Sequence, residues 1–285
     1  MSRLRSAVLF LFAMSLASCA PRSRAEPHCA WRVCVSYTDG PGGRDYFADN
    51  REPVPVTIGL VFRSMENLRP PPGGRVDVVV PPMSTVDVVH LTRFRPSRPV
   101  GAGLAVQIDL GSSTNVPDDF VYAVPFGGTQ PREVIQGYGG EETHLASMYY
   151  SLDVAMPEGT PILAARAGVV LLVQDGFRRG GTDPELLERS NLVVIAHADG
   201  TMASYGHLQR GVRVRVGQRV EEGALLGMSG ATGFAGQPHL HFHVGNRMLG
   251  EPGRTIPIRM RDARGAPVDF SVGTWIPPAE RRPAP

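Results

Sequence analysis

The stretch of sequence that decides the fold is His239-Leu-His-Phe-His243. Its histidines alternate with apolar residues at the period of a β-strand, so the three histidines share one face while Leu240 and Phe242 face the core. Same-side residues stand about 6–7 Å apart, so two neighbouring histidines, but rarely all three, reach one metal ion. A catalytic zinc site keeps three protein ligands, often imidazoles, and one open position. The pattern therefore indicates a zinc site, although a solvated polar strand face has the same alternation.

Three residues outside this run carry matching chemistry. Asp153 is a lone acid inside the apolar run 151–155, where an unpaired buried carboxylate is costly and a metal ion would offset that cost. The alternative is an aspartate on the solvent side of an edge strand. His144 stands nine residues earlier, across a loop, and His207 follows a predicted strand end. The chain has no His-Glu-x-x-His motif, so histidine must transfer the protons, which its pKa near neutrality suits.

Five segments resemble the LytM/lysostaphin-type zinc endopeptidases, and they occur in that family's order between about residues 120 and 260. They are His144 to Asp153, Met156–Val170, Tyr205–Leu208, Ser229–Phe234 and Pro238–Phe242. The resemblance implies an antiparallel β-fold with a groove lined by loops and one zinc ion (Zn2+) per chain. It also implies amide hydrolysis, in which zinc polarises the scissile carbonyl and activates a water while a histidine transfers the proton.

The resemblance implies a role for each of these residues. The implied metal ligands are His144, Asp153 and His241. His207 and His239 match the two catalytic histidines that are not ligands, which transfer protons and stabilise the oxyanion.

The chain departs from the family pattern at two places. Many relatives carry the first ligand four residues before the aspartate, where this chain has Tyr149; a longer spacer in some relatives fits His144, with His197 the only serious substitute. His243 stands where relatives often carry Glu or another polar residue, and we expect it beside the ligands rather than on the metal. Tyr205 either helps to hold the oxyanion or packs in the core.

With these residues in place, the resemblance implies a zinc-dependent metalloendopeptidase that hydrolyses the peptide cross-links of bacterial cell-wall peptidoglycan. The alternative is a non-catalytic scaffold that activates cell-wall amidases, as in relatives that have lost ligands. The complete set of ligands and histidines favours the enzyme. A biotinyl or lipoyl carrier, suggested by residues 216–223, is excluded because the chain has no Lys to modify.

The N-terminus reads as a lipoprotein signal. Arg3 and Arg5 precede the apolar stretch 7–16, which is too short to span a bilayer, and the stretch ends at a lipobox-like Leu-Ala-Ser-Cys19. We expect lipidation of Cys19, export, and anchoring to the cell envelope; Ala20 favours the outer membrane, facing the periplasm. An ordinary signal peptide with a chance cysteine is the alternative.

Composition and strand pattern predict a mainly β protein. The 285 residues include 33 Gly and 26 Pro, which is typical of many turns and short strands. The net charge is only +2, and the sequence has no basic run dense enough to bind nucleic acid. The expected order is signal peptide 1–19, tether 20–28, small β-sandwich 29–124, LytM-type antiparallel sheet or barrel-like domain 125–262, and a partly disordered extension 263–285. One short helix is expected at 182–189. The sandwich reads as a spacer, a wall-binding module or an inhibitory cap, and the oligomeric state stays open.

Cys29 and Cys34 remain after Cys19. Their spacing in an exported chain permits a small disulfide, and two free thiols are the alternative. In either case the two cysteines read as structural, because no His or Asp stands at metal-ligand spacing from them.

Overall fold

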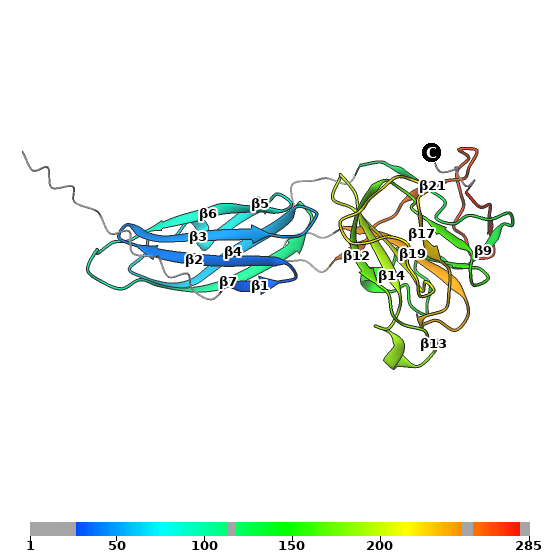
Figure 1. Ribbon diagram of the computed structural model, residues 1–285, viewed down its shortest axis with the longest axis horizontal. Coiled ribbons are helices and arrows are strands. Elements are labelled where there is room, and N and C mark those ends of the chain that lie inside the picture. Colours follow the sequence, from blue (N-terminus) through cyan, green and yellow to red (C-terminus); the bar gives the residue numbers. More distant parts are fainter. Residues whose placement is uncertain (1–26, 113–117, 247–252, 280–285) are drawn as a thin grey trace, which may run out of the picture.

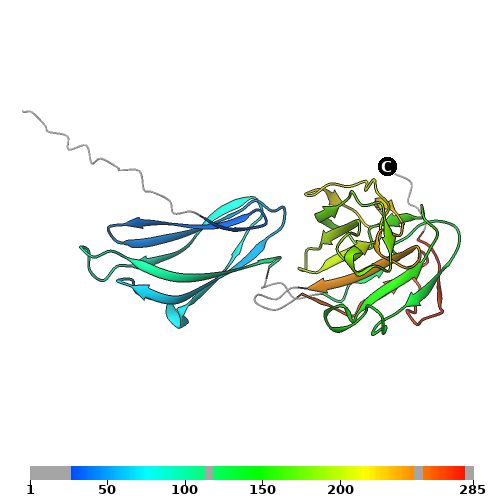
Figure 2. The same cartoon turned by 90° about the horizontal axis from the view of Figure 1, so that it is seen from below.

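The computed structural model describes residues 27–112, 118–246 and 253–279, and in these ranges the protein is mainly β, as predicted. Two β-rich bodies lie end to end in both views (Figures 1 and 2). The described residues include no helix long and apolar enough to cross a membrane. The signal segment, Cys19 and most of the tether lie outside the described ranges.

The first body is the predicted β-sandwich. One antiparallel sheet has the order β1 (His28–Ala30), β2 (Val33–Gly40), β3 (Gly43–Asn50) and β6 (Ser84–Thr92). The other has the order β5 (Arg75–Val80), β4 (Val56–Glu66) and β7 (Gly101–Leu110). The inner faces of both sheets share one core, which includes Tyr46 from the first sheet and Ile58 and Leu60 from the second.

Polar residues interrupt the apolar alternation of the β2–β3 hairpin, so the sequence pattern does not mark it as a pair of strands. Its turn depends on Gly43, where φ is +148° and a Cβ would lie 1.9 Å from the carbonyl oxygen of Leu91. Arg44 lies near the turn and donates to the Asp39 carboxylate at 2.6 Å. A side-chain pair and a glycine thus hold a hairpin that hydrophobic periodicity does not reveal.

The cysteines of β1 and β2 form a disulfide. Cys29 and Cys34 are direct partners in the antiparallel register, and their sulfur atoms are bonded. Of the two alternatives that the spacing permits, the structure therefore has the disulfide.

The second body is built on a nine-stranded antiparallel sheet. Its order is β16 (Arg219–Val220), β12 (Gly168–Gln174), β14 (Leu192–Ala196), β15 (Met202–Gly206), β19 (His239–Asn246), β10 (Ser151–Ala155), β9 (Arg132–Gln136) and β22 (Trp275–Ile276), with β20 (Arg254–Thr255) on β19. Within the described residues, β16 and β22 do not pair with each other, so this sheet is open and the expected barrel-like closure is absent. Leu240 and Phe242 are fully buried, as the alternation in β19 predicts.

Three two-stranded sheets complete this body. They are β11 (Pro161–Leu163) with β17 (Leu225–Met228), β13 (Gly180–Gly181) with β18 (Gly233–Phe234), and β8 (Val121–Ala123) with β21 (Arg259–Arg261). The last two pairs are parallel. Because β8 pairs with β21, the second body includes residues before the expected start at 125.

The prediction of a helix at 182–189 is wrong. The structure has only the 3₁₀ turn η3 (Pro184–Leu186) between β13 and β14. Leu186 is the one buried residue of 182–189, so a longer helix would have almost no face to pack against the core. The Asp183 side chain caps this turn by accepting a hydrogen bond from the Glu185 amide at 3.0 Å. Two further 3₁₀ turns are η1 (Pro72–Gly74) and η2 (Ala146–Met148).

The expected C-terminal extension joins the sheet. β22 pairs with β9, and Ile276 is buried in the core of the second body. The Val134 amide donates to the Thr274 carbonyl at 2.9 Å. Residues 263–279 are therefore part of this body rather than a separate tail, and residues 280–285 lie outside the described ranges.

Candidate metal centre

Asp153 and His241 are brought together by strand register. They are direct partners in the antiparallel pair β10–β19, so their side chains project from the same face of the sheet. The Nδ1 atom of His241 lies 2.7 Å from Oδ1 of Asp153. Asp153 is 7% exposed, so this carboxylate is nearly removed from water.

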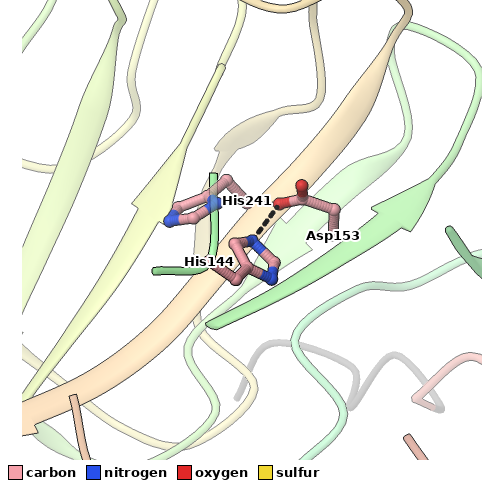
Figure 3. A group of neighbouring side chains, drawn as sticks. All are labelled: His144, Asp153 and His241. Atoms are coloured by element: carbon pink, nitrogen blue, oxygen red, sulfur yellow. Dashed lines mark hydrogen bonds and ion pairs between the residues drawn. The ribbon is translucent and has the colours of Figure 1, made fainter. Parts of the chain in front are cut away.

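His144 completes the group from the loop between β9 and η2. Its side chain is fully buried, and its Nδ1 donates to the Gly137 carbonyl at 2.7 Å. A carbonyl can only accept, so Nδ1 carries the proton and the neutral ring presents the lone pair of Nε2. That atom lies 3.3 Å from Oδ1 of Asp153. Figure 3 shows both imidazoles turned toward the carboxylate.

The three side chains fit a metal ion. Their ligand atoms lie within 4.8 Å of one another, and Nε2 of His144 is buried without a hydrogen-bond partner among the described residues. A lone pair and a carboxylate that face each other out of water require a cation between them, either a proton or a metal. Imidazole nitrogens with one carboxylate oxygen form a donor set that zinc accepts.

Electrostatics within the group agree with this need for a cation. Burial alone would raise the pKa of Asp153, but the contacts with His144 and His241 outweigh it and hold that pKa well below its ordinary value. Burial lowers the pKa of His144, and the contact with Asp153 more than reverses this and raises it. The carboxylate therefore stays charged and attracts positive charge to its neighbours.

His207 and His239 lie beside the metal group as a facing pair, with ring centroids 4.5 Å apart. Each turns Nδ1 to a backbone carbonyl: His207 to Thr232 at 2.7 Å and His239 to Gln237 at 2.8 Å. In the neutral rings, this leaves Nε2 as an acceptor. Nε2 of His239 lies 3.7 Å from Oδ1 of Asp153, so its free nitrogen is turned toward the group.

The backbone at His207 is strained. Its φ is +59°, a left-handed conformation that costs a non-glycine residue of order 1–3 kcal/mol. The hydroxyl of Ser190 accepts a hydrogen bond from the His207 amide at 2.9 Å and helps to hold it there. Burial, with the nearby rings of His239 and His241, lowers the pKa of His207 to about 4. His207 is thus held as a neutral acceptor near neutral pH.

His243 lies behind His241. Its Nδ1 is 3.2 Å from Nε2 of His241, and it is not one of the three grouped residues. A metal ion on Nδ1 of His241 would place the proton of His241 on Nε2, from which it would be donated to Nδ1 of His243. Burial, with the charge of His241 as the next cause, lowers the pKa of His243 to about 3, so it stays a neutral acceptor.

Tyr205 packs in the core. It is fully buried, and its hydroxyl oxygen accepts a hydrogen bond from the Ala165 amide at 2.9 Å. Of the two roles considered for Tyr205, the structure supports packing.

His197 lies apart from the metal group. Its ring stacks edge-on with Tyr122, and its Nδ1 donates to the Ala167 carbonyl at 2.9 Å. It lines a crevice of about 390 Å³ between the two bodies, and none of the residues at the metal centre lines that crevice. The substitute ligand is therefore not brought to Asp153, and Tyr149 is 48% exposed at the surface.

The burial of His197 predicts a pH-dependent stability. Burial lowers its pKa to about 4, below the ordinary value of about 6.5, so the unfolded chain binds the proton more readily. This stabilisation is present above pH 6.5 and is lost as the pH falls toward 4, by about 2 kcal/mol at pH 5. We expect the free energy of unfolding in urea to fall about 2 kcal/mol less between pH 8 and pH 5 in His197→Gln than in the unchanged protein.

The control for that prediction is His28→Gln, at an exposed position, which should leave the pH difference of the unchanged protein intact. Equal losses of stability in His197→Gln and the unchanged protein would show that His197 is not buried as a neutral group.

Sequence reasoning missed the groups that orient the histidines. Three of them are backbone carbonyls, of Gly137, Thr232 and Gln237, and any residue type supplies a carbonyl, so no sequence signal marks them. Ser190 is the one side chain among them, and serine is too common to single out without the fold.

A known family of peptidases matches the part of the chain that contains most of this site. Residues 147–252 match the model described as peptidase family M23. The chain carries an M23 peptidase domain. The match includes Asp153, His207, His239 and His241, and it begins three residues after His144, which the geometry places in the group.

Several relatives each match about a third of this chain and less than a quarter of their own length. Cell division protein DipM of Caulobacter vibrioides is 36% identical over 93 residues, which is 33% of this chain and 14% of DipM. Peptidoglycan DD-endopeptidase ShyA of Vibrio cholerae is 37% identical over 92 residues, 32% of this chain and 19% of ShyA. A solved catalytic domain of the M23 protein EnpA from Enterococcus faecalis, in a mutant form, is 29% identical with a TM-score of 0.35, covering 48% of this chain and 94% of that domain.

Proposed function

We propose that this protein is a zinc-dependent metalloendopeptidase that hydrolyses peptide cross-links of bacterial peptidoglycan. The observation that carries the proposal is the group of buried His144, buried Asp153 and half-buried His241 beside two histidines with free acceptor nitrogens. Membership in family M23 and the peptidoglycan endopeptidase ShyA among the relatives support the substrate class.

In this proposal Nε2 of His144, the Asp153 carboxylate and Nδ1 of His241 would hold the metal. Zinc, when bound, supplies Lewis-acid activation of a water and of the scissile carbonyl. His207 and His239 transfer protons through Nε2, because Nδ1 of each is occupied by a carbonyl. Once protonated, the same imidazoles donate to the developing oxyanion or to the leaving amine.

His243 acts in this proposal as a positioning residue. By accepting the Nε2 proton of His241 at 3.2 Å, it fixes the tautomer that presents Nδ1 to the metal. His243 lies two residues after His241 on the same face of β19, about 6–7 Å further along the strand, which supports this role rather than ligation.

The competing function is a non-catalytic scaffold. One relative, DipM, is named as a cell division protein and not as a peptidase, which is why this alternative is considered. A chain that only binds a partner has no need for a buried carboxylate ringed by imidazoles, which is costly without a cation. The retained set of five residues argues for catalysis.

We further propose that Cys19 carries a lipid anchor and that the protein is exported to the cell envelope, with the outer membrane facing the periplasm as its site. The lipobox-like sequence supports this placement, and the disulfide between Cys29 and Cys34 suits an oxidising compartment. Metabolic labelling with a fatty acid would attach label to the unchanged protein and not to Cys19→Ala.

The test of the proposed function is hydrolysis of purified peptidoglycan by the full-length protein. We expect about one equivalent of zinc per chain, release of muropeptides with new amino termini, loss of both on chelation, and recovery with added zinc. Less than about one-tenth of an equivalent of zinc, together with no released peptide, would instead favour the scaffold.

A further inference from the structure

A hollow of about 580 Å³ opens beside the two catalytic histidines and is not used by the chemistry described above. Its lining includes Thr232 and Gln237, the residues whose carbonyls hold His207 and His239, and also Pro238, which precedes His239. A peptide held in the site would therefore extend directly into this hollow.

One wall of the hollow carries Arg178 on a braced segment. Just before it, the amides of Gly176 and Phe177 both donate to Oδ1 of Asn191 at 2.9 Å. Just after it, β13 pairs in parallel with β18, and Gly180 approaches so closely that a Cβ there would lie 1.4 Å from the Ala231 carbonyl oxygen. The backbone at Arg178 is thus fixed on both sides.

A separate segment carries Arg210 into the lining of the same hollow. The amide of Gln209 donates to the Met228 carbonyl at 2.9 Å, and the amide of Gly211 donates to Oδ1 of Asp175 at 3.0 Å. The Asp175 carboxylate is occupied by these backbone amides, including that of Val212 at 3.1 Å. Arg210 is therefore presented from anchored backbone as well.

The hollow has excess positive charge. Neither Arg178 nor Arg210 forms an ion pair within the described ranges, in contrast to Arg166, which is paired with two aspartates. Among the residues that line the hollow, Glu158 is the single acid, and its Oε2 already accepts a hydrogen bond from Gln209 at 3.1 Å. The lining thus carries two guanidinium groups and one carboxylate, and that carboxylate already accepts a hydrogen bond within the hollow.

We propose that this hollow binds a free carboxylate of the peptide substrate, next to the bond that is cut. The inference rests on the proposed peptidase function and narrows its substrate class. A planar guanidinium binds a carboxylate through two parallel hydrogen bonds, and carboxylates are the only anions that a peptide contains. The enzyme then selects cross-linked peptides with acidic residues or free termini over uncharged bridges such as oligoglycine.

The test compares one cross-linked muropeptide in two forms, with free carboxylates and with the same carboxylates converted to carboxamides. For the full-length, zinc-loaded protein we expect KM to be about tenfold higher for the carboxamide form. Arg178→Gln and Arg210→Gln should each raise KM for the carboxylate form about five- to tenfold, with little change in kcat, and should not affect the carboxamide form. The matched control is Arg215→Gln, an exposed arginine outside the hollow.

Binding of the same two peptides, labelled with a fluorophore and measured by anisotropy, separates this inference from the proposed function. If the unchanged protein cleaves neither peptide, the proposed function fails, and the ratio of the two dissociation constants still tests the hollow. Equal affinity for both forms, or equal effects of Arg178→Gln and Arg215→Gln, would overturn the inference.

Discussion

The Asp153→Ala protein is expected to lose bound zinc and hydrolysis together. Asp153 is the one carboxylate of the metal group, and its Oδ1 lies within 3.7 Å of nitrogens of His144, His239 and His241. Without it, two neutral imidazoles remain, which form a far weaker zinc site. We expect zinc to fall below about one-tenth of an equivalent and kcat/KM to fall at least about a thousandfold, or about 4 kcal/mol of transition-state stabilisation.

A matched control exists in the N-terminal sandwich. Asp45 contacts Nδ1 of His90 at 2.6 Å, so Asp45→Ala removes a similar Asp–His contact far along the chain from the metal group. Zinc content by mass spectrometry and peptide release should be unchanged in this control. If Asp153→Ala kept full zinc and full activity, the assigned metal centre would be wrong.

Zinc binding and peptide release should also distinguish Asp153 from its neighbour His243. His243→Ala removes the acceptor of the His241 proton but no ligand, so its zinc affinity should fall about 10- to 100-fold, with activity recovered in excess zinc. A chelator competition would show this intermediate affinity. The loss at Asp153 and the weakening at His243 together distinguish a ligand from a residue that positions one.

Local sequence chemistry was sufficient to predict the strands β10 and β19 of this site, but not that they pair. Strict alternation placed Leu240 and Phe242 in the core, and a lone acid in an apolar run marked Asp153. The choice of His144 over His197 came from resemblance, and its geometry follows from a loop carbonyl at Gly137 that no pattern predicts. Register between distant strands supplies the rest, because 88 residues separate Asp153 from His241.

The features that the sequence did not predict share a physical cause. The strands β2 and β3 depend on polar cross-strand contacts, and β13 on a close backbone approach at Gly180. β22 is two residues long and forms only because β9 offers an unpaired edge. Such elements are specified by tertiary partners, so hydrophobic periodicity carries little information about them.

Replacing His207 should separate catalysis from metal binding. His207 lies outside the ligand group, so His207→Ala should keep about one equivalent of zinc while kcat falls about 10²- to 10⁴-fold, the usual contribution of a general acid–base. Because His207 and His239 face each other at 4.5 Å, the double substitution to alanine should cost little more than the larger single loss. His90→Ala, at an exposed histidine of the sandwich, is the control for both.

The backbone at this position adds a second readout. With φ at +59°, glycine fits without strain and alanine does not, so His207→Gly should be more stable than His207→Ala by about 1 kcal/mol in urea unfolding, although both have the lowered kcat. Such a result would mean that the protein accepts a strained backbone in order to aim this imidazole at the metal site. If His207→Ala lost its zinc, or if the glycine and alanine proteins were equally stable, His207 would be a structural residue and His239 the remaining candidate for proton transfer.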